Sequence, residues 1–387
     1  MTVFDELVGQ ERVVDELRAA AAAGDAQARG GSGSGMTHAW LLTGPPGSGR
    51  SNAARAFAAA LQCREGGCGR CPDCHQVLAG THADVEVVRP SGLSYSVRET
   101  RSLVLRAGQA PTRGRFQIVL FEDADRATEQ AANALLKAIE EPGPRTVWLL
   151  CTPSPDDLVT TIRSRCRLVS LRTPPASAVA EVLVHRDGVD REVAAFAARA
   201  SQGHIGRARR LATDERARLR REEVLRIPLS LGDIGACLEA AARLVSAAAD
   251  EAGATTQEAD ARETTELRQA LGEGGSRKSL PRGSAAPLRD LEERQKSRAT
   301  RVKRDSLDRA LLDLASFYRD VLCLQLGANV ALANAERTAD LRAFADRTSL
   351  ESTLRRLDAI TECRTRLDAN ANPQLAVEAM TLALRAG

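Results

Sequence analysis

The sequence contains few aromatic residues and no long apolar run. Only 3% of its 387 residues are aromatic, so we expect small aliphatic side chains to pack most of the interior, which favours helices. No apolar stretch approaches the roughly 20 residues that a membrane-spanning helix needs. The first residues lack the basic start and apolar run of a secretory signal. We therefore expect a cytoplasmic protein with no membrane contact.

The chain also has little net charge. Its 54 basic and 51 acidic residues leave a formal charge of +3, which argues against a protein that coats polyanions but leaves local basic faces open. Hydrophobic residues make up 43% of the chain, enough for ordered cores. The length predicts two or three domains.

Short apolar runs alternate with helical patterns over the first 170 residues or so. Helices are predicted over 51–61 and 129–141, and strands over 39–43, 116–121, 146–152 and about 167–171. Strands that alternate with helices indicate a parallel sheet. From Pro174 onward the pattern is almost wholly helical. The predicted fold class is therefore α/β plus all-α.

One segment, residues 250–304, departs from this pattern. It is charged, rich in Gly, Ser, Thr and Ala, and has no aromatic residue. Such a composition buries too little apolar area to offset the entropy of ordering, so we expect a largely disordered insertion. Its basic end, 294–304, fits either a solvated charge run or a DNA contact.

A glycine-rich segment resembling a phosphate loop follows the first expected strand and precedes a helix. Its sequence is GPPGSGRS (44–51), in which Arg50 stands where a phosphate loop has lysine. A guanidinium keeps the positive charge but is planar and wider than an ammonium, so it need not fit the same pocket. Glu122 and Asp123 end a later strand, like an acidic pair that holds magnesium. We predict a degenerate nucleotide site that binds ATP and Mg²⁺ weakly or not at all, formed by Gly44, Gly47, Gly49, Arg50, Ser51, Glu122 and Asp123. A glycine-rich turn with no ligand is the alternative.

Four of the nine cysteines are clustered. Cys63, Cys68, Cys71 and Cys74 have the spacing C-x4-C-x2-C-x2-C, with glycines between them. Disulfides are rare in a reducing compartment, whereas four neighbouring thiolates can surround one tetrahedral zinc ion. We predict a closed structural zinc site.

A run of alternating arginines lies further along the chain, at Arg163, Arg165 and Arg167. It is either the basic edge of a strand or the source of an arginine finger, which stabilises a phosphoryl group in transfer and can be supplied by a neighbouring subunit. Position alone does not decide between these two interpretations.

Taken together, these segments resemble bacterial clamp-loader subunits of the AAA+ superfamily. The resemblance rests on Val8-Gly9-Gln10, the glycine loop, the four cysteines, the helix NALLKAIEEP (133–142) and Ser164-Arg165-Cys166. It covers residues 1–211 well and the C-terminal helices around 370–375 more loosely. It implies three domains: a RecA-like AAA+ domain with a zinc module (1–172, module 63–74), a small helical lid (173–227), and a helical collar (228–387) interrupted by the 250–304 insertion.

Two departures favour the delta-prime branch of this family over the gamma/tau motor branch. They are Arg50 and a glycine, Gly206, at the second-sensor position, although a shift of one residue would place Arg207 there. The resemblance then implies a stationary subunit without intrinsic ATPase activity. Arg165 would reach the ATP of an adjacent motor subunit, while Ser164 and Cys166 hold the turn that presents it.

The implied partners are delta and three gamma/tau subunits in a hetero-pentamer. That complex would open a sliding clamp and place it on primed DNA for DNA polymerase III, at the nucleoid-associated replisome. No polymerase active site is visible in the sequence, so polymerase activity would belong to the whole complex. Two alternatives remain: an ATP-hydrolysing gamma/tau-type motor in which Arg50 replaces lysine, and a zinc-bearing scaffold that binds DNA through its basic insertion.

Overall fold

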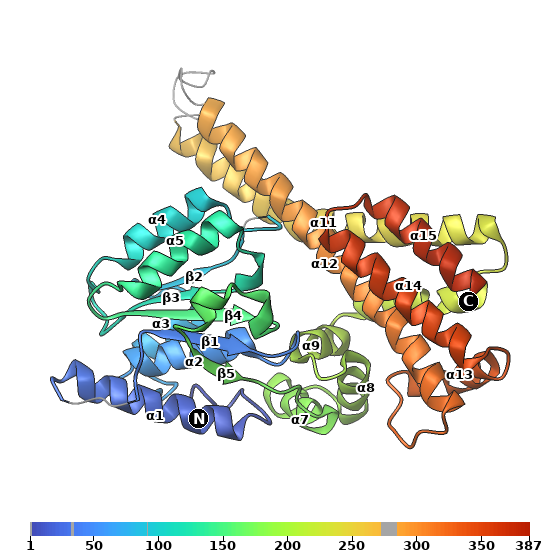
Figure 1. The fold of residues 1–387 in the computed structure, drawn as a ribbon, viewed down its shortest axis with the longest axis horizontal. Helices are drawn as coiled ribbons and strands as arrows, with labels where there is room; N and C mark the ends of the chain where they lie inside the picture. Colours follow the sequence, from blue (N-terminus) through green and yellow to red (C-terminus); the bar gives the residue numbers. More distant parts are fainter. Residues whose placement is uncertain (1, 32–34, 91, 272–284) are drawn as a thin grey trace. The chain divides into compact units, whose positions relative to one another are not determined.

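The computed structural model describes residues 2–31, 35–90, 92–271 and 285–387. The chain forms two units, each with its own core (Figure 1). The first comprises residues 1–90 and 94–213, and the second comprises residues 91–93 and 214–387.

The first unit contains a five-stranded parallel sheet with the order β2-β3-β4-β1-β5. Residues of β1, β3 and β4 are buried along their whole length, as expected for central strands that are covered on both faces. Because the strands are parallel, the loops that follow β1 and β3 leave the sheet at the same edge. The strands are Ala39–Thr43 (β1), Val85–Val88 (β2), Gln117–Phe121 (β3), Thr146–Thr152 (β4) and Arg167–Ser170 (β5).

Helices cover both faces of this sheet (Figure 1). Successive residues of a strand point to opposite faces, so Trp40 and Leu42 pack into the core with α1 and α2, while Ala39 and Leu41 pack with α4 and α5. These helices are Glu11–Ala28 (α1), Arg50–Gln62 (α2), Pro72–Ala79 (α3), Val97–Ala107 (α4), Glu129–Glu140 (α5) and Thr160–Arg163 (α6). The parallel sheet and flanking helices expected of a RecA-like AAA+ domain are present.

Three helices complete the first unit: Ala176–Asp187 (α7), Arg191–Ser201 (α8) and Ile205–Thr213 (α9). The long segment of the second unit begins at Asp214, which lies within the predicted lid of residues 173–227. The division into three domains therefore stays a prediction.

The second unit is entirely helical in its described part. Its core centres on Phe317, Tyr318 and Phe344, whose rings meet edge to face at centroid distances of 5.5–5.8 Å. The predicted fold class, α/β plus all-α, is thus confirmed. No described helix combines the length and apolarity needed to cross a membrane. The helices are Glu215–Ser230 (α10), Ile234–Ala270 (α11), Ala285–Gln325 (α12), Thr338–Ala345 (α13), Leu350–Asp368 (α14) and Pro373–Ala386 (α15).

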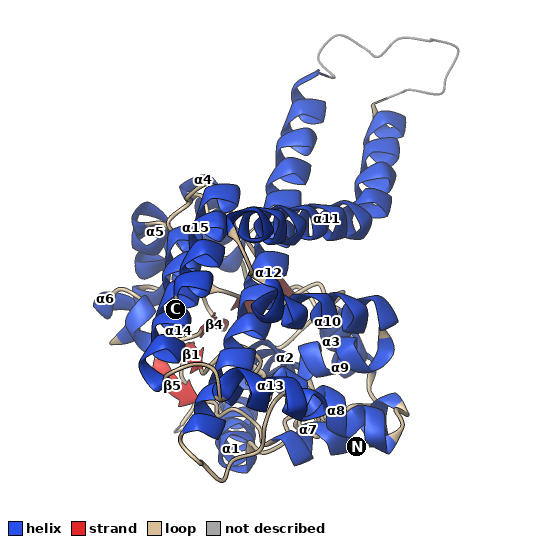
Figure 2. Cartoon of the chain, turned by 90° about the vertical axis from the view of Figure 1, so that its right-hand side faces the viewer, coloured by secondary structure: helices blue, strands red, loops and turns tan. Residues whose placement is uncertain are grey.

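The expectation of a largely disordered insertion over 250–304 is wrong for most of that range. Residues 250–270 belong to α11 and residues 285–304 to α12 (Figure 2), and residues 272–284 lie outside the described part. The seam between the two helices buries the small residues Ala252 and Thr256 together with Leu291. Average composition predicts disorder here because the contact between the two helices contains few large apolar side chains.

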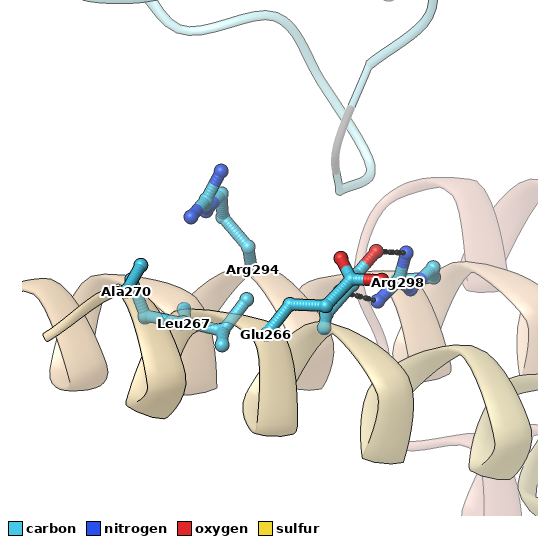
Figure 3. Close-up of a pocket in the computed structure, with 7 residues that line it drawn as sticks. Glu266, Leu267, Ala270, Arg294 and Arg298 are labelled. Atoms are coloured by element: carbon cyan, nitrogen blue, oxygen red, sulfur yellow. Dashed lines mark hydrogen bonds and ion pairs between the residues drawn. The ribbon is translucent and has the colours of Figure 1, made fainter. Parts of the chain in front are cut away.

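Polar contacts across the same seam add to this packing. The Arg298 guanidinium lies 2.5 Å from the Asp260 carboxylate and 2.6 Å from that of Glu263. Figure 3 shows the Arg298 side chain with dashed lines that mark its contacts. The Gln295 amide donates to the Asp260 carbonyl at 3.0 Å and to the Thr264 hydroxyl at 3.2 Å. These contacts hold α11 and α12 side by side where apolar residues are sparse.

Candidate functional site

The glycine loop connects β1 to α2 and depends on backbone angles that glycine adopts readily. Gly44, Gly47 and Gly49 have φ values of 146°, 86° and 93°, a region that side chains with a Cβ disfavour. A Cβ on Gly44 would lie 2.5 Å from the Leu171 carbonyl oxygen, and one on Gly47 would lie 2.4 Å from the His204 side chain. The loop is therefore closely packed against the segment that leads into α9.

The residue that replaces the lysine of a phosphate loop is bonded to the loop itself. The Arg50 guanidinium donates to the carbonyl oxygen of Gly44. A lysine in a working phosphate loop reaches the outer phosphates of the nucleotide, whereas here the cation is used in an internal contact. Ser51, which would bind magnesium, lies in the first turn of α2.

The acidic residue of the predicted magnesium pair is held by two arginines. Glu122 is buried, and its carboxylate accepts from Arg89 at 2.6 and 3.2 Å and from Arg55 on α2 at 3.2 Å. The hydrogen bond to Glu122 raises the pKa of Arg89. Its neighbour Asp123 has a left-handed backbone with φ of 50°. The structure thus brings α2 and the strand end of β3 together, with guanidinium groups on the carboxylate where a metal ion would bind in a working site.

Sequence reasoning missed Arg55 and Arg89. Arg89 is 33 residues from Glu122, and no local spacing connects them. The register of the sheet brings them together. Val88 of β2 pairs with Phe121 of β3, so the residues that follow them, Arg89 and Glu122, are neighbours. Arg55 lies on α2, within the second turn after the glycine loop.

The four clustered cysteines are arranged as a tetrahedral metal site requires. Their Sγ atoms all lie within 4.8 Å of one another, and that of Cys63 lies 3.7 Å from those of Cys68 and Cys71. Zn–S bonds of about 2.3 Å place sulfur atoms about 3.8 Å apart in a tetrahedron. Cys63 follows α2, and Cys71 and Cys74 begin α3. The residues present therefore fit zinc.

Backbone N–H groups point at these sulfur atoms. Those of Glu65 and Cys68 donate to the Cys63 Sγ at 3.3 and 3.5 Å, and that of Cys74 donates to the Cys71 Sγ at 3.4 Å. A backbone N–H bond at Arg70 is the main cause that lowers the pKa of Cys68 to about 7, whereas burial raises the pKa of Cys74. Coordination to zinc would deprotonate the thiols outright.

Arg165 lies in the turn between α6 and β5 and its side chain is 41% exposed. Its guanidinium donates to the Thr161 carbonyl at 2.9 Å and to the Ser164 hydroxyl at 3.3 Å, and it lies 2.7 Å from the Glu140 carboxylate. The Ser164 hydroxyl also donates to Thr161 at 3.1 Å. Cys166 is half-buried, and this burial raises its pKa to about 12, so its thiol is protonated at neutral pH.

The two flanking arginines are engaged differently. Arg163 forms an ion pair with Asp156. Arg167 pairs with Glu16 at 2.8 Å and its guanidinium lies 4.9 Å from the centre of the Trp40 ring, a cation–π contact. Arg167 therefore contributes to packing within the first unit. At the start of α9, Gly206 is exposed and Arg207 half-buried, and the assignment of either one as second sensor stays a prediction.

Two family models match this chain. One, described as "DNA polymerase III, delta subunit", matches residues 29–175, and the other, "DNA polymerase III, delta subunit, C terminal", matches residues 302–385. Among curated relatives, the DNA polymerase III subunit delta' of Pseudomonas aeruginosa is 40% identical over 152 residues, which are 38% of this chain and 46% of the relative. Residues 29–175 and 302–385 thus match DNA polymerase III delta-subunit families, in agreement with the resemblance to clamp-loader subunits.

Two other curated relatives match a similar share of the chain. The subunit delta' of Bacillus subtilis is 32% identical over 155 residues, or 39% of this chain and 47% of the relative. The subunit gamma/tau of Mycobacterium tuberculosis is 33% identical over 177 residues, or 44% of this chain and 29% of the relative. The chain thus spans less than half the length of these relatives. The resemblance stated from the sequence is confirmed at the level of the family.

Proposed function

We propose that this chain is a delta-prime-type clamp-loader subunit that does not hydrolyse ATP and supplies Arg165 to the ATP site of a neighbouring gamma/tau subunit. The observation that carries this proposal is a contrast between two sets of arginines. Arg50, Arg55 and Arg89 bind the chain's own glycine loop and Glu122. Arg165 lies outside that site, on a surface turn where it contacts Thr161, Ser164 and Glu140.

The contacts of Glu122 support a nucleotide site that binds ATP and Mg²⁺ weakly or not at all. To bind magnesium, this carboxylate would have to give up the guanidinium groups of Arg55 and Arg89. Hydrogen bonds to charged groups contribute about 1.5–3 kcal/mol each to stability, so magnesium must compete with partners already in place. Arg50 would also have to leave Gly44 before it could reach a phosphate. ATP and Mg²⁺ therefore bind weakly or not at all.

The chemistry of an arginine finger fits Arg165. A guanidinium is always charged and offers five N–H donors, and fingers supplied in trans accelerate phosphoryl transfer by about 10³–10⁵-fold. The turn that carries Arg165 is held by Ser164 and Thr161. In this role Ser164 and Cys166 position the turn without taking part in the reaction.

The remaining assignments follow from the same role. Zinc, held by Cys63, Cys68, Cys71 and Cys74, would order the module between α2 and α3. The helical second unit would act as the collar that joins delta and gamma/tau subunits in a hetero-pentamer. This complex would load the sliding clamp onto primed DNA at the replisome in the cytoplasm.

Nucleotide binding is tested by titrating ATP and Mg²⁺ into the purified chain in a calorimeter, with a gamma/tau subunit as the positive control. We expect no saturable binding up to millimolar ATP. The variant Arg50→Lys should also show no saturable ATP binding, because Glu122 keeps its two arginine partners. Saturable binding and turnover by the unaltered chain would instead support the motor alternative. The finger is tested by the ATP turnover of a reconstituted complex that carries Arg165→Ala.

A further inference from the structure

Glu140 occupies an electrostatically unfavourable position. It is the last residue of α5, where the negative end of the helix dipole disfavours a carboxylate. This carboxylate lies 2.7 Å from the guanidinium of Arg165, and the two side chains are 42% and 41% exposed. The ion pair therefore connects the end of α5 to the turn after α6.

The contacts of Arg165 leave part of its guanidinium available. One terminal nitrogen donates to the Thr161 carbonyl and the Ser164 hydroxyl, and the other faces Glu140. These contacts occupy at most three of the five N–H groups that a guanidinium offers. At least two N–H groups remain for the oxygens of a phosphate.

We propose that Glu140 is a positioning residue for Arg165. The inference rests on the proposed function, because it assigns Glu140 to the same finger. A free arginine side chain loses rotamer freedom when it binds a phosphate in one geometry. Glu140 and the α6 turn restrict the side chain beforehand, so less freedom is lost in the transition state. Glu140 itself does not touch the nucleotide.

The test uses the complex reconstituted with delta and gamma/tau subunits, and measures ATP turnover stimulated by primed DNA. Glu140→Gln keeps the shape of the side chain and removes its charge. An ion pair with half-exposed partners is weak, so we expect kcat to fall about two- to fivefold with KM for ATP unchanged. The adjacent Glu141→Gln is the matched control, since Glu141 is exposed and forms no ion pair within the described residues. Its turnover should equal that of the wild type.

A double variant separates positioning from a general structural role. If Glu140 acts through Arg165, Glu140→Gln should cause no further loss in a complex that already carries Arg165→Ala. Glu140→Asp, which keeps the charge on a shorter side chain, should retain more turnover than Glu140→Gln. Gel filtration of each complex confirms that assembly is intact.

Three results would overturn the inference. Turnover of Glu140→Gln at or above the wild-type rate would show that the carboxylate does not assist the finger. An additive loss in the double variant would show that Glu140 acts elsewhere. If Arg165→Ala does not lower turnover, the proposed function fails and this inference fails with it. If Arg165→Ala lowers turnover but Glu140→Gln does not, only the role of Glu140 is rejected.

Discussion

Removal of the predicted zinc ligands should destabilise the first unit and leave the second unit unchanged. The double variant Cys68→Ser/Cys71→Ser replaces two half-buried ligands and leaves the buried Cys63 and Cys74 in place. The metal cross-links a loop of about 12 residues, and a single cross-link of that length contributes about 3 kcal/mol by the loop-closure relation. For a unit of this size, a loss of about 3 kcal/mol lowers Tm by about 6–12 °C.

The loss should be local because the surrounding core is apolar. Cys63 and Cys74 pack into the cluster that contains Phe57, Leu61 and Val77, which does not depend on metal. The N-terminal segment should also loosen, since Val3 donates to the Gly67 carbonyl at 3.0 Å, within the cysteine module.

Metal analysis and differential scanning calorimetry of the purified chain measure both effects. We expect one zinc per chain for the wild type and for the control Cys323→Ser, and none for the double variant. In the double variant, only the unfolding transition of the first unit should move to lower temperature. Stoichiometric zinc in the double variant would refute the assignment of these ligands. A wild-type chain that contains no zinc yet unfolds at the same temperature as the double variant would refute the site itself.

Three further predictions concern stability. Burial opposes ionisation of Asp84, but the N–H groups of Thr112, Gly114 and Arg113 outweigh it and lower its pKa below 3.8. The stabilisation is therefore complete well above pH 3.8 and is lost as the pH falls through the folded pKa, so Asp84→Asn should cost about 1.5–3 kcal/mol at pH 7 and less at pH 3 in calorimetry. Equal losses at both pH values would contradict this. Arg221→Leu removes the buried guanidinium that pairs with Asp313 and Glu336, and urea denaturation should show a loss of about 3–5 kcal/mol; a loss below 1 kcal/mol would show that the network relaxes. Arg298→Ala removes only partly exposed ion pairs, so it should cost less than about 1 kcal/mol and leave the helical circular dichroism unchanged, whereas a large loss of helix would show that the seam depends on this residue.

The parts of the fold that local patterns specify were predicted from the sequence. Strand β1, the glycine loop and α2 follow one another directly, so their order and chemistry are visible in the sequence. The four cysteines lie close together in the chain, and the structure brings their sulfur atoms within metal-binding distance. Arg165 was identified through the family resemblance, and its role stays a prediction.

The parts that depend on non-local contacts were not predicted. The pairing of Arg89 with Glu122 follows from the register of β2 on β3, and that of Glu140 with Arg165 follows from the packing of α5 on the α6 turn. The helices of 250–270 and 285–304 were missed for a different reason. Their seam relies on small residues such as Ala252 and on ion pairs across the two helices, which a measure of average composition does not register.

ATP turnover by the complex with delta and gamma/tau subunits, in the presence of primed DNA, measures directly whether Arg165 acts at the ATP site of a neighbouring subunit. We predict that Arg165→Ala in this chain alone strongly lowers turnover while gel filtration shows an intact complex. Arg163→Ala, two residues away and paired with Asp156, serves as the matched control and should keep most of the turnover. Unchanged turnover in an intact complex that carries Arg165→Ala would show that Arg165 is not an arginine finger.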